Sequence, residues 1–116
     1  MSFKFALLCI ETYKELAFKR HEHVLSKQLL RSGTSIGSNI EEGNQAESKA
    51  DFIHKMSISN KEASETSYWI RLLRDSETVE RERAELLLAE CEELIRMLTA
   101  TLNTAKHNTI RNTQSH

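Results

Sequence analysis

The stretch GTSIG, from Gly33 to Gly37, has the small residues of a phosphate-binding loop. A Walker A loop also needs a lysine directly after its last glycine, and no lysine follows Gly37 closely. A dinucleotide fingerprint must follow a strand, and no strand pattern precedes Gly33. Close packing between helices is therefore the better interpretation of these small residues.

Histidine and acidic side chains do not form a recognisable metal site. His21 and His23 would point to opposite sides of a helix, and no third ligand accompanies them. Asp51 with His54 is the nearest approach to the paired ligands of a di-metal bundle, which also needs a second such pair and two further carboxylates. We expect no metal, no cofactor and no catalytic residue; a catalytic set assembled only by folding is the alternative.

The composition is that of one all-helical domain. The 116 residues include no proline and only three glycines, and Leu, Ala, Glu, Lys and Arg are abundant. The chain has neither an apolar run of about 18 residues nor a cleavable leader, so we expect a cytoplasmic protein without a membrane partner. Cys9 and Cys91 lack CxxC or CxxH spacing, which predicts buried free thiols.

Apolar residues recur at helical spacing in four segments. They predict helices over 2–19, from about 22 to 43, from about 45 to 74, and a fourth whose apolar positions run from 84 to 105. Asn44 with Glu47 resembles a capping box for the third helix. Short turns predict antiparallel neighbours, so residues 1–105 should form an elongated up-down-up-down four-helix bundle, with residues 106–116 as a polar, disordered tail.

One side of each helix should face the core. On the first helix we expect inward positions at Phe3, Ala6, Leu7, Ile10, Tyr13 and Ala17; on the second, at Leu25, Leu29, Ser32, Gly33, Ile36, Ile40 and Gly43. The third should bury Phe52, Met56, Ser59, Ala63, Thr66, Ile70 and Leu73, and the fourth Ala84, Leu87, Leu88, Cys91, Leu94, Ile95, Leu98, Leu102 and Ala105. The glycines and serines of the second helix allow a neighbouring backbone to approach closely.

A second apolar side is present on several helices. Its members are Phe5, Cys9, Leu16, Ile58, Trp69, Leu72, Val79, Leu86 and Met97. A single bundle needs one apolar side per helix, so the second side predicts self-association. The expected interface is Ile58, Glu62, Trp69, Leu72, Leu86 and Met97; the alternative is a wide core with ordinary exposed apolar residues.

Basic residues recur on the expected second helix. Arg20, His23, Lys27 and Arg31 are spaced three and four apart, opposite Leu25 and Leu29. This basic stripe is a candidate surface for the phosphates of RNA or DNA. A solvated helix face balanced by acidic neighbours is the alternative, and the net charge of −1 excludes a strongly basic polyanion binder.

Three patterns together resemble one family. They are SI..NI.EG, met by Ser35, Ile36, Asn39, Ile40, Glu42 and Gly43; S..DF, met by Ser48, Asp51 and Phe52; and KEA.ET.YW, met by Lys61, Glu62, Ala63, Glu65, Thr66, Tyr68 and Trp69. On these residues the chain resembles the bacterial four-helix-bundle family, also called the 23S rRNA intervening-sequence protein family. The similarity extends to about Ala105. Where relatives often have proline, this chain has Gly37.

The resemblance implies an antiparallel four-helix bundle that assembles into a ring, as a homo-oligomer of five copies. It also implies kinship with accessory proteins of diversity-generating retroelements, which are thought to bind nucleic acid alongside a reverse transcriptase. The acidic balance of this chain departs from those basic relatives. We therefore expect a non-enzymatic scaffold or interaction protein, with RNA or DNA binding through the basic stripe as the alternative. Asn39 and Glu42 are expected to fix register through hydrogen bonds to a neighbouring turn or partner subunit.

Overall fold

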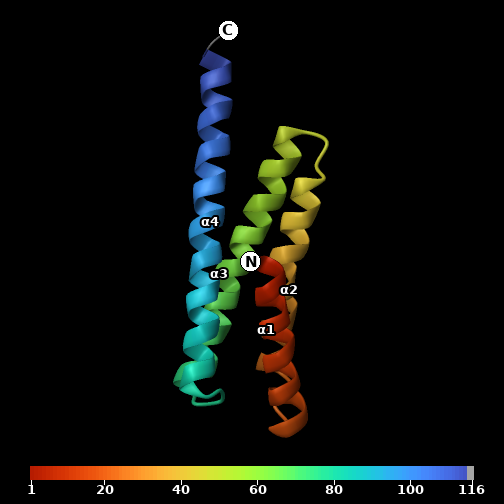
Figure 1. The fold of residues 1–116 in the computed structure, drawn as a ribbon, viewed down its shortest axis with the longest axis vertical. Coiled ribbons are helices and arrows are strands. Elements are labelled where there is room, and N and C mark those ends of the chain that lie inside the picture. Colours follow the sequence, from red (N-terminus) through yellow and green to blue (C-terminus); the bar gives the residue numbers. More distant parts are fainter. Residues whose placement is uncertain (115–116) are drawn as a thin grey trace.

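The protein is an elongated antiparallel four-helix bundle in the computed structural model, which describes the backbone of residues 1–114 and the side chains of residues 1–108 (Figure 1). Helix α1 (Ser2–Lys14) is extended by a π-helical segment, η1 (Glu15–Lys19). Helices α2 (Leu25–Asn44), α3 (Lys49–Asp75) and α4 (Arg81–Gln114) follow. Consecutive helices pack on one another, α1 also touches α4, and the molecule measures 59 × 23 × 19 Å. The predicted fold is confirmed.

The connection between α1 and α2 contains no glycine or proline. Its residue His21 has a φ of 59°, a left-handed conformation that side chains with a Cβ rarely adopt. The break falls where the sequence predicted it, but α2 begins at Leu25 and not near Glu22. The first helix also ends in a π-helical segment from Glu15.

Glu22 caps the start of α2 with its own carboxylate. Oε1 accepts hydrogen bonds from the backbone amides of Leu25 (3.0 Å) and Val24 (3.2 Å), and Oε2 accepts one from Ser26 (2.8 Å). Partial burial alone would raise the pKa of Glu22, but the amides of Leu25, Ser26 and Val24 outweigh that effect and lower it. This carboxylate therefore satisfies amides that the first helical turn leaves without partners.

The turn between α2 and α3 differs from the predicted capping box. Ser48, and not Asn44, caps α3, since its hydroxyl accepts a hydrogen bond from the amide of Asp51 at 3.1 Å. Gly43 lies within α2 with a right-handed backbone, so it does not form a left-handed helix end. A Cβ at Gly43 would come within 2.7 Å of Met56 Cε, and this glycine therefore allows α3 to approach closely.

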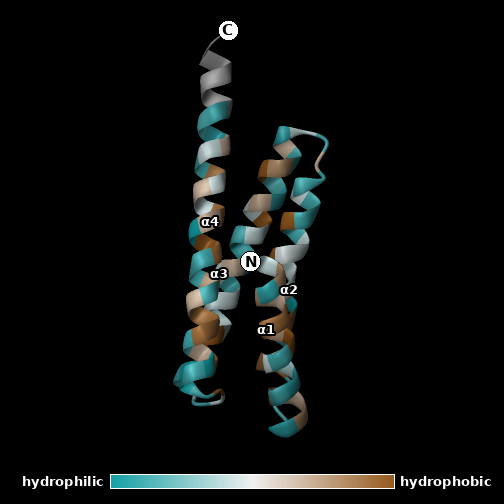
Figure 2. Cartoon of the chain, in the orientation of Figure 1, coloured by the Kyte–Doolittle hydropathy of each residue, from teal (hydrophilic) through white to brown (hydrophobic). Residues whose placement is uncertain are grey.

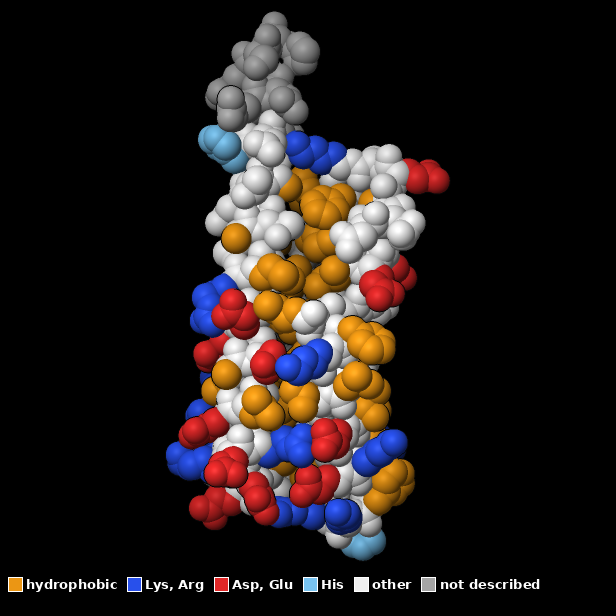
Figure 3. Space-filling model, viewed as in Figure 1, with side chains coloured by type: hydrophobic (Ala, Val, Ile, Leu, Met, Phe, Trp, Pro, Cys, Tyr) orange, Lys and Arg blue, Asp and Glu red, His pale blue; other side chains and the backbone are white. Residues whose placement is uncertain are grey.

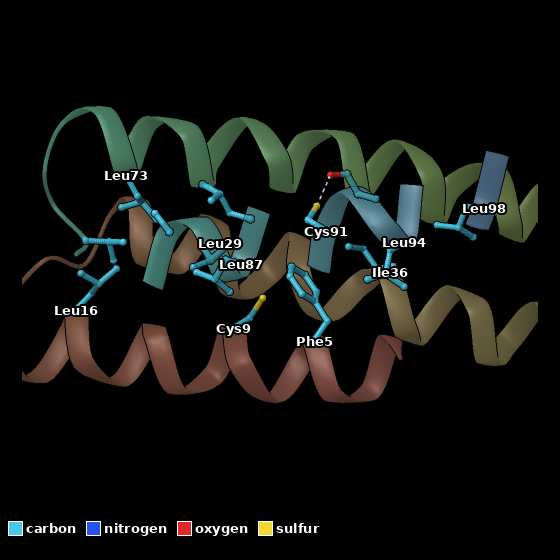
Figure 4. Packing of buried hydrophobic residues seen from close by; sticks show 14 of the residues in the cluster. Phe5, Cys9, Leu16, Leu29, Ile36, Leu73, Leu87, Cys91, Leu94 and Leu98 are labelled. Atoms are coloured by element: carbon cyan, nitrogen blue, oxygen red, sulfur yellow. Dashed lines mark hydrogen bonds between the residues drawn. The ribbon is translucent and has the colours of Figure 1, made fainter. Parts of the chain in front are cut away.

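Hydrophobic and hydrophilic residues alternate along the labelled helices, and the hydrophobic ones meet in a central core (Figures 2 and 4). The predicted inward sides of α2, α3 and α4 are confirmed. Their buried members are Leu29, Ser32, Gly33, Ile36, Gly43, Met56, Ser59, Ala63, Thr66, Ile70, Leu73, Ala84, Leu87, Cys91, Leu94, Leu98, Leu102 and Ala105. Leu25, Ile40, Phe52, Leu88 and Ile95 are partly buried against this core.

The orientation of α1 is the main correction. Phe5, Cys9 and Leu16 are at most 1% exposed and point into the core, although the sequence assigned them to the second apolar side (Figure 4). Phe3 and Leu7 were expected inside, yet they are 70% and 52% exposed. The first helix is therefore rotated from its predicted orientation.

Two polar residues give the physical reason. Lys14 lies on the same side of α1 as Phe3 and Leu7 by helical spacing, and its charge keeps that side out of the apolar core. The Phe5 side carries Thr12, which can be buried because its hydroxyl donates to the carbonyl of Leu8 at 2.8 Å. Of the residues expected to point inward on the first predicted helix, only Ala17 is fully buried.

Buried hydroxyl groups join α2 to α3 at the centre of the bundle. Ser59 Oγ donates to the carbonyl of Ile36 at 2.8 Å, and Thr66 Oγ1 lies 2.9 Å from Ser32 Oγ. Because these hydroxyl groups are satisfied within the protein, small polar residues can be enclosed where two helices approach closely. They fix the register of α2 against α3.

The end of α4 differs from the predicted disordered tail. The backbone from residue 106 to Gln114 continues α4 as a helix. Residues 115–116 lie outside the described part of the chain.

Candidate functional site

The basic stripe is not one continuous helical surface. Arg20 and His23 precede α2, so only Lys27 and Arg31 lie on that helix. Arg20 Nη1 donates to the carbonyl of Thr78 at 2.8 Å, and its other terminal nitrogen lies 3.9 Å from Glu80 Oε1. Arg20 thus ties the end of η1 to the turn before α4.

Arg31 joins α2 to α3 through two carboxylates. One terminal nitrogen is 3.3 Å from Glu62 Oε2, and the other forms a hydrogen-bonded ion pair with Glu65. The hydrogen bond to Glu65, aided by the charges of Glu65 and Glu62, raises the pKa of the Arg31 guanidinium. Its positive charge is therefore largely neutralised within the chain. Lys27 is exposed, and no carboxylate pairs with it among residues 1–108.

Two of the three family patterns lie in the second half of α2 and at the start of α3, and the third, from Lys61 to Trp69, lies further along α3. Asn39 Nδ2 donates to the carbonyl of Ser35 at 2.9 Å, within α2. Glu42 pairs with Lys55 at 3.1 Å, across to α3. Among the described residues, Asn39 therefore bonds within its own helix and not to the neighbouring turn, whereas Glu42 links two helices. A bond from either residue to a partner subunit stays a prediction.

Ser35, Asp51 and Phe52 complete this set. Ser35 supplies the carbonyl for Asn39, Asp51 supplies the amide that Ser48 caps, and Phe52 is partly buried against the core. With the close contact at Gly43, these arrangements serve the α2–α3 turn.

The expected interface residues divide by exposure into a partly buried group and an exposed group. Ile58 and Trp69 are half-buried on α3, and Glu62 is engaged by Arg31. Leu72, Leu86 and Met97 are 36%, 46% and 37% exposed. Val79, placed on the same second side by the sequence, is only 7% exposed and belongs to the core.

A continuous set of exposed residues on α4 includes two of these. Leu86, Ala89, Glu93, Met97 and Ala100 are all exposed and follow one another at steps of three or four residues. Such steps keep side chains on one side of a helix. We call this set the outer face of α4.

A further apolar surface lies on α1 and was missed by the sequence analysis. Phe3, Leu7, Ile10 and Lys14 share the side of α1 that faces away from the core, and we call them the outer face of α1. Phe18, in η1, is also 67% exposed. Figure 3 shows hydrophobic side chains over this part of the molecule. The alignment of Lys14 with Phe3 and Leu7 was the sequence signal for this face.

The cysteines are buried free thiols, as predicted. Burial raises the pKa of both Cys9 and Cys91 to about 12. Cys91 Sγ donates to the carbonyl of Ala63 at 3.2 Å. Among the described side chains, no group of three or more His, Cys, Asp or Glu residues is placed to hold a metal ion. Within the same part of the chain, no helix is long and apolar enough to cross a membrane.

Comparison with known proteins identifies relatives without assigning an activity. No curated protein sequence matches the chain. The chain is similar to a solved structure from Bacteroides thetaiotaomicron VPI-5482, described as a protein with unknown function from the S23 ribosomal protein family. The two share 46% identity with a TM-score of 0.85, over 87% of this chain and 94% of that one. The family model of the 23S rRNA-intervening sequence protein matches residues 1–100, so the chain belongs to that family.

Proposed function

We propose that the protein is a non-enzymatic, homo-oligomeric helical scaffold. The supporting observation is the outer face of α1, where Phe3 and Leu7 are 70% and 52% exposed on the side opposite the core. Burying such side chains removes roughly 25 cal/mol of unfavourable free energy per Å² of apolar surface. A contiguous apolar surface on an otherwise polar bundle is typical of a protein–protein contact.

The number of copies is part of this proposal. The family resemblance implies a ring of five copies. In a ring each copy uses two different surfaces, one to bind the preceding copy and one to bind the next. Kinship with retroelement accessory proteins, and a reverse transcriptase as partner, stay predictions. The absence of catalytic chemistry is likewise proposed, and the family-pattern residues support it because their contacts stabilise the α2–α3 turn.

Light scattering coupled to size exclusion tests the assembly directly. We expect the wild-type chain at micromolar concentration to have several times the monomer mass of 13.4 kDa. Phe3→Lys should lower that mass while circular dichroism keeps its helical signal, since Phe3 does not contribute to the core. Ser64→Lys is the matched control, because it adds the same charge at an exposed polar position on α3. A wild-type monomer rejects the proposal.

RNA or DNA binding is the second candidate, and Lys27 supports it. Lys27 is exposed, and no described carboxylate neutralises it. Affinity for structured RNA and duplex DNA should fall as salt rises, because bound phosphates release counterions. Lys27→Glu is the suitable variant. Arg31→Glu would instead place a third carboxylate beside Glu62 and Glu65, and would disturb the fold as well as any ligand. Absence of affinity even at low salt removes this candidate.

A further inference from the structure

The outer faces of α1 and α4 have matching lengths. Phe3 and Lys14 are 11 positions apart and Leu86 and Ala100 are 14 positions apart, which correspond to about 16 Å and 21 Å of helix. Both faces repeat at steps of three and four residues, the spacing at which two helices pack side by side. Exposed alanines at 89 and 100 let another helix approach α4 closely. The two faces therefore have the dimensions of one helix–helix contact.

The charges around the two faces are opposite. Residues 1–20 carry four Lys or Arg against two Glu, and residues 81–97 carry five Glu against three Arg. Lys4 and Lys14 form no ion pair within the described residues, and neither do Glu82 and Glu90. Like faces would therefore repel across a contact, whereas α1 and α4 of two copies attract each other.

From this match we propose that the outer face of α1 in one copy packs against the outer face of α4 in the next copy. The inference rests on the proposed homo-oligomer and names its contact. The occupant of each apolar face is a second copy of this chain, because the complementary length and charge lie on the chain itself. Leu7 and Phe3 meet the side of α4 that carries Leu86 and Met97, and Lys4 and Lys14 face its glutamates.

The arrangement of the bundle favours closure into a small ring. Helices α1 and α4 touch each other, so they occupy neighbouring corners of the four-helix section and their outer faces point in different directions. A contact between two different faces of the chain repeats from copy to copy and forms a ring when the rotation between copies closes. The number of copies in such a ring stays a prediction.

Mixing two variants tests the pairing. Leu7→Glu places a negative charge in the α1 face, and Leu86→Glu places one in the α4 face; both residues are about half exposed, at 52% and 46%. Each variant alone should be monomeric, because one partner of every contact is lost. An equal mixture should give a dimer with one copy of each, joined by the intact α1 face and the intact α4 face.

Tyr68→Glu provides the matched control. Tyr68 is also large and exposed, at 48%, but it lies on α3 and belongs to neither face. We expect its mass to equal that of the wild type. Leu7→Ser and Leu86→Ser, with helicity measured for every variant, separate loss of contact from loss of folding.

The outcomes distinguish the inference from the proposal on which it rests. A wild-type monomer removes both. A wild-type oligomer that survives either Leu7→Glu or Leu86→Glu leaves the scaffold standing and overturns the α1–α4 contact. The same holds if the folded variants are monomeric but their mixture yields no dimer.

Discussion

Cys9 on α1 packs directly against Gly33 on α2. A Cβ built on Gly33 would lie 2.4 Å from Cys9 Sγ and 3.2 Å from Cys9 Cβ, well inside van der Waals contact. The thiol therefore occupies the space that any larger residue at position 33 would need. This contact explains why a glycine is retained in the middle of α2, where glycine disfavours the helix by roughly 1 kcal/mol relative to alanine.

Gly33→Ala should destabilise the protein despite the better helix propensity of alanine. Overpacking a filled core typically costs about 1–3 kcal/mol. In a Cys9→Ala background the same change should cost much less, since the obstructing sulfur is gone and only the milder 3.2 Å contact with the Cβ at position 9 is left. Urea unfolding of the four chains in this double-mutant cycle measures the coupling.

Gly37→Ala is the control. Its Cβ would lie 3.4 Å from Ser2, an ordinary contact, so this substitution should stabilise the protein by up to about 1 kcal/mol. Additive effects at positions 9 and 33 would contradict the steric explanation.

The sequence predicted three helix orientations correctly because α2, α3 and α4 each have one side without charge. On α1 both sides are rich in large apolar residues, so spacing alone could not choose between Phe3 and Phe5. Threonine at position 12 is compatible with the core because its hydroxyl bonds to its own helix, whereas Lys14 is not. Polar residues therefore determined the orientation that apolar ones left open.

The candidate surfaces were predicted less completely. Leu86 and Met97 were expected on a second apolar side outside the core of the single chain, and they are exposed there; their place in an oligomer interface stays a prediction. The ion pairs of Arg31 were not foreseen, because they depend on the register of α2 against α3, which is set by contacts far apart in the sequence. The outer face of α1 was missed because the sequence analysis assigned that side of the helix to the core.

Glu22→Gln should lower stability at neutral pH by about 1 kcal/mol, the usual contribution of a helix cap. The folded-state pKa of Glu22 is lowered, so the folded chain holds this proton less tightly than the unfolded chain. The stabilisation is present above the unfolded pKa and disappears as pH falls through the lower folded value. Wild type and variant should therefore differ at pH 7 and converge in acid, as urea unfolding at several pH values will measure. Glu47→Gln, at an exposed position, should change little at any pH.

His21→Gly should stabilise the protein by up to about 1 kcal/mol. A left-handed backbone is disfavoured by about 1–2 kcal/mol for residues with a Cβ, and the greater freedom of glycine in the unfolded chain offsets part of the gain. His23→Gly is the matched control, because His23 does not have a positive φ. It should give no gain in thermal unfolding. Equal effects at the two positions would show that backbone strain is not the cause.

Both cysteines should be unreactive toward a thiol reagent in the folded protein. With a pKa of about 12, only about one thiol in ten thousand is ionised at pH 8, and Cys9 and Cys91 are also fully buried. Absorbance with a disulfide reagent should show little reaction under native conditions and two reacting thiols in urea. Because the Cys9 side chain points from α1 onto Gly33 of α2, its labelling requires α1 to separate from α2. Cys9→Ser should remove one of the two equivalents. Rapid native labelling of Cys9 would mean that α1 detaches from the bundle far more often than its packing indicates.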